Sequence, residues 1–206
     1  AVNYGSANAT WSLPRVVGAD PTDGIEITVA SQVLGPFLLT SLLLPALAAA
    51  TATGRVITVS SGGMYATGLT VRHLQMSERD YKGSEQYARA KRAQVTLNEM
   101  WAQRVPAAQV VFHAMHPGWA DTPGVEEALP TFRKITGPLL RSVEEGADTM
   151  MWLAADGAAL AGSGDFWHDR RRRSIHKLPT TRKADTPERR ADLWAWCVEQ
   201  TGEVTP

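Results

Sequence analysis

The sequence Ser84-Glu85-Gln86-Tyr87-Ala88-Arg89-Ala90-Lys91-Arg92 predicts the beginning of a long helix. Apolar residues recur along it at helical spacing, namely Ala90, Ala93, Leu97, Met100 and Trp101. Tyr87 and Lys91 are four residues apart, so they lie on one face of this helix, one turn apart. A positive charge beside a phenol favours the phenolate, and we therefore predict that Lys91 lowers the pKa of Tyr87 from its usual value of about 10. For an isolated pair of this kind, the alternative is a half-buried tyrosine beside a lysine that extends to solvent.

The stretches on either side of this helix are predicted to be buried strands. Upstream, Val56-Ile57-Thr58-Val59 is β-branched without a break and ends in Ser60-Ser61-Gly62-Gly63. Downstream, the apolar run 110–115 is broken by Pro117-Gly118, and Thr122 follows. Open α/β sheets place their chemistry at the C-terminal ends of strands, so these segments form the candidate site.

A strand ending in serine, a helix with tyrosine and lysine, and a strand followed by Pro-Gly-x-x-x-Thr together resemble the short-chain dehydrogenase/reductase superfamily. The resemblance extends from about Asp23 to Pro179. It is closest to the subgroup of member 12-like proteins in five stretches, 55–64, 87–92, 115–125, 145–154 and 163–179. It implies an α/β fold with a Rossmann-type, doubly wound parallel sheet. It also implies an oxidoreductase that transfers a hydride between NAD or NADP and a small-molecule carbonyl or alcohol substrate.

The resemblance implies roles for four residues. Tyr87 would exchange a proton with the substrate oxygen, while Lys91 would lower the Tyr87 pKa and bond the nicotinamide ribose. Ser61, the second serine of its pair, would orient the carbonyl or alcohol. Gln32 stands where the family has a catalytic asparagine, which is a departure from the pattern. Pro36 has no N–H to bond the carbonyl of Gln32, so we expect that carbonyl to hold a water molecule beside Lys91.

The segment 117–122 resembles the family's clasp around the nicotinamide ring. The implied contacts to NAD or NADP come from Tyr87, Lys91, Pro117, Gly118, the backbone of Ala120 and the hydroxyl of Thr122. His113 and His116 flank this segment, and we predict that both pack within the strand and loop. No spacing typical of metal ligands is present, so no metal site is predicted.

Two connecting segments are expected to shape the substrate site. Residues 124–141 would form a lid after the clasp. The polar loop 64–84, with Met64, Tyr65 and Met76, would lie over the substrate, and its length suggests a large or apolar substrate.

The family's glycine-rich turn, Thr-Gly-x-x-x-Gly-x-Gly, does not occur in the 206 residues. In the family, this turn holds the cofactor pyrophosphate. We therefore expect a single domain, 1–206, that is N-terminally truncated, has an incomplete sheet lacking the first βαβ units, and ends in a C-terminal extension, 170–206. Such a chain is expected to lack activity by itself, and the choice between NAD and NADP is not readable. The alternative is a non-catalytic scaffold that acts through oligomerisation or partner binding.

Bulk composition limits the partners and the compartment. The chain has 21 basic and 21 acidic residues, which predicts neither a nucleic acid nor an anionic membrane as partner. The arginine run 170–173 is predicted to be a solvated loop, with a nucleic-acid patch as the alternative. The single cysteine, Cys197, excludes an internal disulfide and favours a reducing, cytoplasmic location.

The segment 22–50 is predicted to be a helix, almost wholly apolar from Val33 onward. Its length is sufficient for a membrane span, but Gly35, Pro36 and Pro45 interrupt it, and we predict no span. A helix buried between the sheet and a neighbouring subunit explains its composition better. The resemblance to the superfamily implies such a helix at a subunit interface, and we expect a homo-oligomer formed through the helices 22–50 and 85–104.

Overall fold

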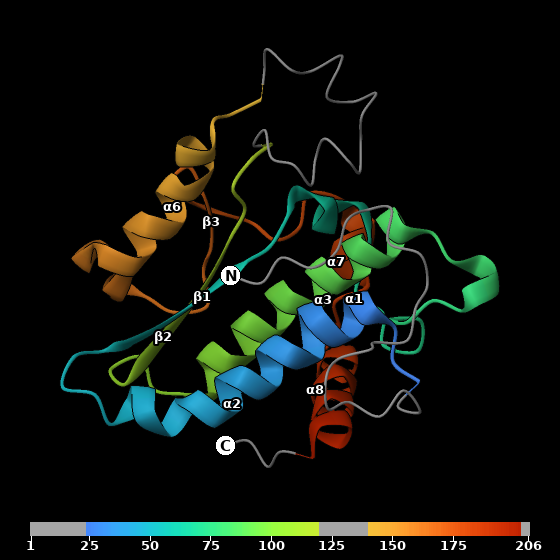
Figure 1. The fold of residues 1–206 in the computed structure, drawn as a ribbon, viewed down its shortest axis with the longest axis horizontal. Coiled ribbons are helices and arrows are strands. Elements are labelled where there is room, and N and C mark those ends of the chain that lie inside the picture. Colours follow the sequence, from blue (N-terminus) through green and yellow to red (C-terminus); the bar gives the residue numbers. More distant parts are fainter. Residues whose placement is uncertain (1–23, 120–139, 203–206) are drawn as a thin grey trace.

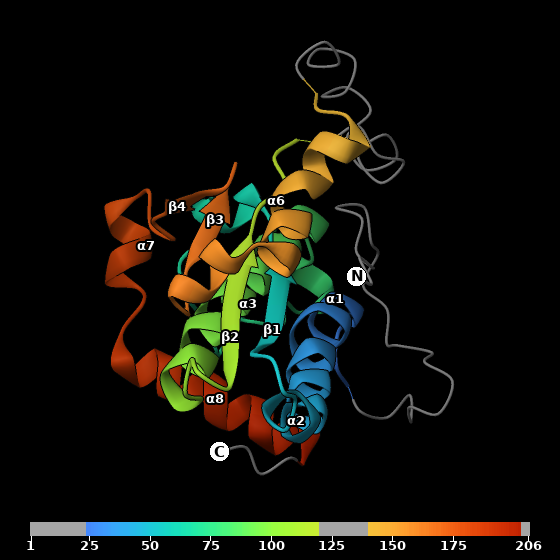
Figure 2. The same ribbon diagram turned by 90° about the vertical axis from the view of Figure 1, so that its left-hand side faces the viewer.

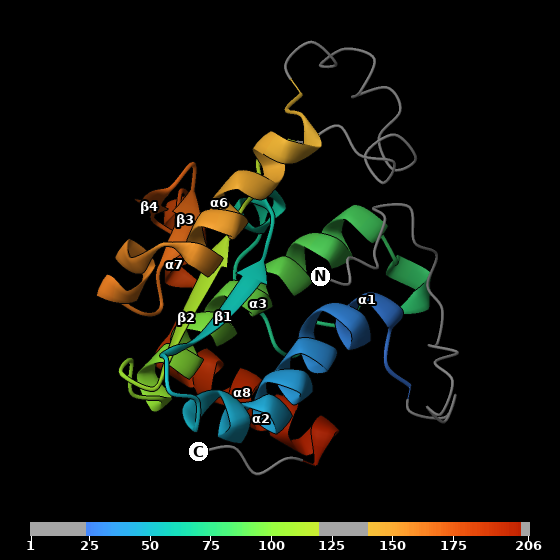
Figure 3. The ribbon, with the colours of Figure 1, turned by 60° about the vertical axis from the view of Figure 1, so that its left-hand side comes forward.

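The computed structural model describes residues 24–119 and 140–202. Its centre is a four-stranded sheet in the order β1-β2-β3-β4, made of Gly54–Val59, Val110–Met115, Phe166–His168 and Arg171–Arg173. The first three strands are parallel, and β4 pairs with β3 in the antiparallel sense. Figure 3 shows α3 and α2 on one face of the sheet and α6 on the other. The predicted α/β class with a doubly wound parallel sheet is confirmed, and the described residues place no strand on the outer edge of β1.

Side chains of β1 and β2 alternate between two cores, as the pleat of a strand requires. Val56 and Phe112 belong to the core beneath α2 and α3. Ile57, Val59 and Met115 pack on the opposite face with Leu153 and Trp167, from α6 and β3. The two faces of the sheet are therefore both covered, and the C-terminal ends of β1, β2 and β3 meet at one edge (Figure 2).

A continuous helical run occupies most of the predicted helix 22–50, whose first two residues lie outside the described part. It consists of α1 (Ile27–Val29), a π-helical turn η1 (Ala30–Leu34) and α2 (Gly35–Ala48). The N–H of Gly35 bonds the carbonyl of Ala30, five residues back. Since Pro36 follows and has no N–H to donate, the wider π-helical turn fits the sequence at this point.

By length and composition, Ile27–Ala48 could cross a membrane, and 39% of its most apolar window is buried inside the protein. Three leucines of α2 are well exposed, Leu39 at 57%, Leu42 at 58% and Leu43 at 47%. The opposite side of α2 packs on α3, where the ring of Phe37 lies 5.3 Å from that of Trp101, and the two helices run side by side in Figure 1.

The helix α3 (Gly83–Arg104) begins one residue before the predicted start, and the predicted apolar stripe is buried. The segment before it contains two short 3-10 turns, η2 (Gly62–Ala66) and η3 (Glu78–Asp80). Met64 and Met76 of this segment are buried in the protein, and the position of the loop over a substrate stays a prediction.

The arginine run forms a strand, so the prediction of a loop was wrong for 171–173. Asp169 and Arg170 take positive φ values of 54° and 53°, which turn the chain back so that β4 pairs with β3. The arginine side chains remain exposed, as predicted. Helix α6 (Val143–Ala155) begins with the capping box of Ser142 and Glu145 and is followed by a 3-10 turn, η5 (Gly157–Ala161).

Two helices complete the chain, α7 (Pro179–Lys183) and α8 (Pro187–Thr201). Leu193 and Cys197 of α8 are fully buried in the core that contains Trp101. Burial raises the pKa of the Cys197 thiol to about 12, so this cysteine behaves as a small apolar residue.

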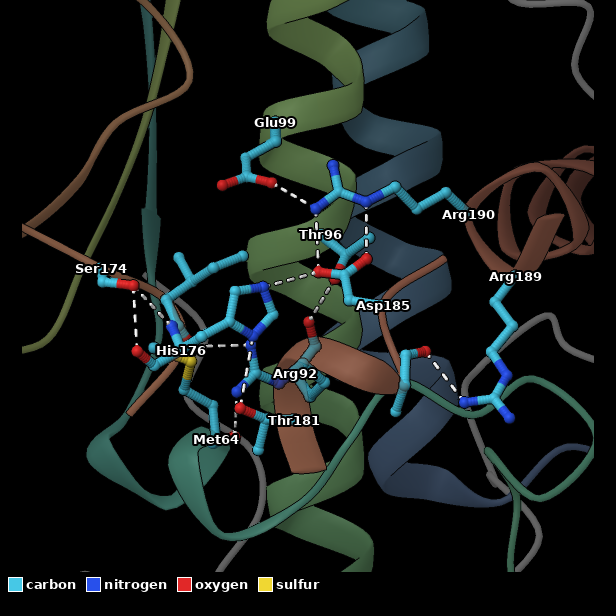
Figure 4. A network of polar contacts seen from close by, with 12 residues as sticks. Met64, Arg92, Thr96, Glu99, Ser174, His176, Thr181, Asp185, Arg189 and Arg190 are labelled. Carbon is cyan, nitrogen blue, oxygen red and sulfur yellow. Dashed lines mark hydrogen bonds and ion pairs between the residues drawn. The ribbon is translucent and has the colours of Figure 1, made fainter. Parts of the chain in front are cut away.

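A C-terminal polar network ties residues 175–190 to α3, and we define it as Arg92, Glu99, His176, Asp185 and Arg190 (Figure 4). The Asp185 carboxylate accepts from Nε and Nη2 of Arg190 at 2.6 and 2.8 Å, and Nε2 of His176 lies 3.1 Å away. Arg190 also contacts Glu99 of α3 at 2.7 Å. This network fixes the C-terminal helices against the helix that carries Tyr87 and Lys91.

Candidate active site

The three predicted catalytic residues Ser61, Tyr87 and Lys91 come together at the C-terminal end of β1. Ser61 follows the strand and caps η2, and its hydroxyl lies near the Tyr87 side chain, whose pKa it acts to lower. Lys91 lies one turn further along α3, with its ammonium nitrogen 5.3 Å from the centre of the Tyr87 ring. The helix spacing and the strand end therefore produce the juxtaposition that the sequence indicated.

Ser60 and Ser61 have different surroundings. Ser60 is buried, and its hydroxyl donates to the carbonyl oxygen of Lys91 at 3.2 Å, which ties β1 to α3. Ser61 is partly exposed, and its Oγ accepts the N–H of Gly63 at 3.2 Å. The second serine is thus the one that faces Tyr87, while the first has a structural bond.

Lys91 is buried, with 3% of its surface exposed, and burial lowers its pKa to about 8. Its ammonium donates to the carbonyl oxygen of Val59 at 3.0 Å. An ammonium group has three N–H donors. Within the described residues one such bond is formed, so donors remain for further acceptors.

The prediction that Lys91 lowers the Tyr87 pKa was wrong for the chain on its own. Burial raises the pKa of Tyr87, and the nearby Ser61 hydroxyl opposes this shift. The ammonium of Lys91 is directed to the Val59 carbonyl and lies against the tyrosine ring. Removal of the phenol from water is therefore the dominant influence on the Tyr87 pKa.

Gln32 lies in the π-helical turn, and its side chain is buried. It lines a small cavity of about 20 Å³ together with Thr58, Gln94 and Asn98. Oε1 of Gln94 and Oδ1 of Asn98 have no hydrogen-bond partner among the described residues. A cavity of this size accommodates about one water molecule. The predicted water at the Gln32 carbonyl stays a prediction, with a polar cavity close to that residue.

The Pro117-Gly118 turn follows β2 at the same edge of the sheet. Gly118 has a φ of 84°, and a Cβ there would lie 2.8 Å from Nε of Arg141. The backbone N–H of Arg141 donates to the carbonyl of Trp119 at 2.8 Å, so the residues on either side of 120–139 are held together. Glycine is required here both by its backbone conformation and by the close approach of Arg141. Ala120, Thr122 and most of the predicted lid 124–141 lie outside the described residues.

Two histidines extend the site across the sheet; the sequence analysis predicted only packing for His116 and did not consider His168. His116 follows β2, and His168 ends β3. Their rings stack with centres 4.8 Å apart, and Nδ1 of His168 donates to the carbonyl oxygen of His116 at 2.9 Å. Their positions at strand ends, matching that of Ser61, were the signal available in the sequence.

His113 packs as predicted and lies on the other side of β2. It is buried, its Nε2 contacts the carbonyl of Ala159 at 2.8 Å, and its Nδ1 accepts from Trp167 at 3.1 Å. No group of three or more potential metal ligands occurs in the parts of the chain that the structure describes.

Comparisons with known proteins agree with this arrangement. No family model matches the chain. The chain is 47% identical to human dehydrogenase/reductase SDR family member 12 over 166 residues, which cover 80% of this chain and 51% of that protein. It is 31% identical to human retinol dehydrogenase 12 over 182 residues, 87% of this chain and 55% of that protein. The chain thus spans about half the length of the curated relatives it matches.

Among solved structures, the chain is similar to an uncharacterized protein from Mycobacterium paratuberculosis. The TM-score is 0.64 at 24% identity, and the match covers 97% of this chain and 67% of that one. At this identity the likeness supports the fold alone.

Proposed function

We propose, from the premise that the chain belongs to the short-chain dehydrogenase/reductase superfamily, that it carries the proton-transfer site of an oxidoreductase. The reaction would interconvert a carbonyl and an alcohol with a nicotinamide cofactor. The observation that supports this most is the convergence of Ser61, Tyr87 and buried Lys91 at one strand end.

Each of the three side chains would have its own role. The Ser61 hydroxyl, partly exposed and close to Tyr87, would donate to the substrate oxygen and fix its position. The Tyr87 hydroxyl would give a proton to that oxygen in reduction or take one in oxidation. Because burial raises the pKa of Tyr87, the protonated form that donates is the stable one in the chain on its own.

The residues present fit the nicotinamide and ribose portion of NAD or NADP. Lys91 has donors beyond its bond to the Val59 carbonyl, and these suit the ribose hydroxyls. Pro117 and Gly118, with Ala120 and Thr122 beyond them, would hold the nicotinamide ring. The bound cofactor would supply or accept the hydride. Gln32 would complete the set through its backbone carbonyl.

The substrate is proposed to be an apolar carbonyl compound or alcohol. Human retinol dehydrogenase 12, one relative, is named for such an alcohol. This extension to the present chain is a proposal, because the chain spans about half of that protein.

The test uses reduced nicotinamide mononucleotide, which carries the nicotinamide and ribose without the adenylate. We expect the 206-residue chain to be inactive with NADH or NADPH at low concentration, because its sequence lacks the glycine-rich turn. At high concentration, the mononucleotide should bind saturably and support reduction of retinaldehyde. Tyr87→Phe should lower that rate by about 10² to 10⁴-fold without changing the circular dichroism spectrum.

Absence of both binding and turnover in a folded sample would overturn the proposal. So would a rate that Tyr87→Phe leaves unchanged. Much tighter binding of NADH or NADPH than of the mononucleotide would show that the chain holds the pyrophosphate by other means.

The second candidate is a non-catalytic scaffold that acts as a homo-oligomer, and the exposed leucines of α2 favour it. Apolar side chains that lie together on one helix are typical of subunit interfaces. We propose that this surface, with α3, contacts a second copy in the cytoplasm.

Sedimentation equilibrium of the wild type and of Leu42→Glu tests this proposal, since the substitution should yield monomers. A monomeric wild type that binds lipid vesicles would overturn it and favour the membrane.

A further inference from the structure

We propose that His116 is a positioning residue that joins the two turns of the candidate active site. Through Nδ1 it would hold the turn that presents Ser61 against the Pro117-Gly118 turn. This inference rests on the proposed function for its catalytic consequence, although its structural content can be tested without any turnover.

The geometry that carries this inference is one ring nitrogen with two backbone donors. Nδ1 of His116 accepts the N–H of Gly62 at 3.1 Å and the N–H of Gly118 at 3.3 Å. Gly62 directly follows Ser61, and Gly118 directly follows Pro117. One imidazole thus bridges the loops after β1 and β2; among the described residues of these loops, the bond of the Ser60 N–H to the Met115 carbonyl is the only backbone hydrogen bond that joins them.

These bonds determine where the ring proton lies. A nitrogen that accepts two N–H groups cannot carry a hydrogen of its own, so the proton of His116 must be on Nε2. A protonated ring would direct an Nδ1–H at two donors and break both bonds. Burial, followed by the charges of His168, Arg141 and Lys177, lowers the pKa of His116 to about 4, which keeps the ring neutral.

The ring is also fixed from its other sides. His168 stacks on it with an angle of 19° between the planes. Asp169, the next residue, forms an ion pair with Arg141, whose guanidinium lies close to Gly118. A Cβ at Gly62 would lie 3.0 Å from Nε2 of His116, so the glycine leaves the space that the ring occupies. The ring and the serine turn are therefore mutually dependent.

The consequence for the proposed reaction concerns distance. Ser61 would hold the substrate oxygen, and the Pro117-Gly118 turn would hold the nicotinamide ring. Displacement of one group relative to the other by a fraction of an ångström to one ångström can lower a rate by orders of magnitude. A residue that fixes the separation of the two turns would act on the rate without touching the substrate.

The matched variants are His116→Asn and His116→Gln. The Asn Oδ1 can occupy the place of Nδ1 and accept the same bonds, whereas the Gln carboxamide reaches the position of Nε2. We expect hydrogen exchange at the amides of Gly62 and Gly118 to accelerate by about tenfold in His116→Gln and to stay near the wild-type rate in His116→Asn. His73→Gln, at an exposed histidine outside this site, is the control and should change neither amide.

Nitrogen NMR of the imidazole gives a second measurement on the wild type alone. We expect the neutral ring of His116 with its proton on Nε2, unchanged from pH 7.5 down to about pH 5.5. A proton on Nδ1, a charged ring in that range, or equal amide exchange in the Asn and Gln variants would overturn the inference. Because the wild-type spectrum suffices, it stays testable even if His116→Gln does not fold.

Kinetics with reduced nicotinamide mononucleotide separate this inference from the proposed function. His116→Gln should lower kcat by at least about tenfold, His116→Asn should restore it, and the pH profile above pH 6 should keep its shape. Loss of one limb of that profile would make His116 an acid or base and would contradict a positioning role. If Tyr87→Phe has no effect while the NMR result holds, the proposed function fails and the bridge stands.

Discussion

Lys91 and Arg92 are adjacent cations on α3, and both are buried, with 3% and 0% of their surfaces exposed. Their side chains face different regions of the protein and have different hydrogen-bond partners. Lys91 points to the candidate active site, donates one described bond to a carbonyl, and has a pKa lowered by burial to about 8. Arg92 donates to the carbonyl oxygens of Met64, Thr67 and Ile175, at 2.7, 3.2 and 2.8 Å.

This difference separates a structural cation from a functional one. Arg92 is surrounded by acceptors, and the nearby carboxylates of Asp185 and Glu99 oppose the effect of burial on its pKa. For Lys91, burial lowers the pKa, and no carboxylate of the described residues opposes that effect. A buried charge with donors to spare destabilises the free chain, and the cost is offset when a ligand with acceptors binds.

The largest change in the free energy of unfolding is expected from Arg92→Met. The substitution leaves three carbonyls without their donor and removes the cation beside Asp185. We expect the free energy of unfolding to fall by about 3–5 kcal/mol, measured by urea denaturation. Arg89→Met is the control, since Arg89 on the same helix is less buried, pairs with Glu85 and donates to a single carbonyl, that of His73, so its loss should cost less than that of Arg92. Equal losses in the two variants would contradict the role given to Arg92.

The substitution Lys91→Met should change the free energy of unfolding in the opposite direction. Removal of a buried charge whose pKa is lowered from 10.5 to about 8 should raise the free energy of unfolding by about 1–3 kcal/mol at pH 7. Because the pKa is lower in the folded state, the unfolded chain binds more protons between pH 8 and 10.5. The wild type therefore gains stability as pH rises through that window, and its deficit relative to Lys91→Met should disappear. A variant that is less stable than the wild type at pH 7 would show that the Val59 bond outweighs burial.

The sequence was sufficient to predict that Ser61, Tyr87 and Lys91 lie together, because the position of each depends on local order. Helix spacing places the tyrosine and lysine on one face, and a parallel strand delivers the serine to the sheet edge. The pKa of Tyr87 could not be obtained in this way, because it depends on how much of the ring other segments cover. The same holds for Arg92, whose carbonyl partners are 25, 28 and 83 residues away.

The same distinction between local features and features that depend on distant segments applies to the fold. The buried strands β1 and β2 and the apolar stripe of α3 are local or periodic features, and these were predicted correctly. Strand β4 was missed because four consecutive arginines carry no apolar alternation, and its pairing depends on the positive φ values of Asp169 and Arg170. The histidine bridge was missed because its partners lie in separate loops.

A pH titration should reveal a smaller effect from His116. Its folded pKa of about 4 lies below the usual 6.5, so between these values the unfolded state binds the extra proton. Stability is therefore complete above pH 6.5 and declines as pH falls towards 4, by about 1–2 kcal/mol after allowance for partial exposure. The difference in unfolding free energy between pH 7 and pH 4.5 should shrink by that amount in His116→Asn. An unchanged difference would show that other groups cause the decline.

The smallest effect is expected on β4, where charges lie at the surface. Arg172 pairs with Asp165 at 3.2 Å and lies 5.3 Å from the centre of the Trp167 ring, with 53% of its side chain exposed. An exposed charge remains hydrated in the folded state, so its partner replaces water at little gain. Arg172→Ala should lower the free energy of unfolding by about 0.5 kcal/mol, and salt should reduce that loss further. A loss comparable to that of Arg92→Met would mean that β4 is needed to hold β3, so that the side chain of Arg172 contributes through the sheet and not through its charge.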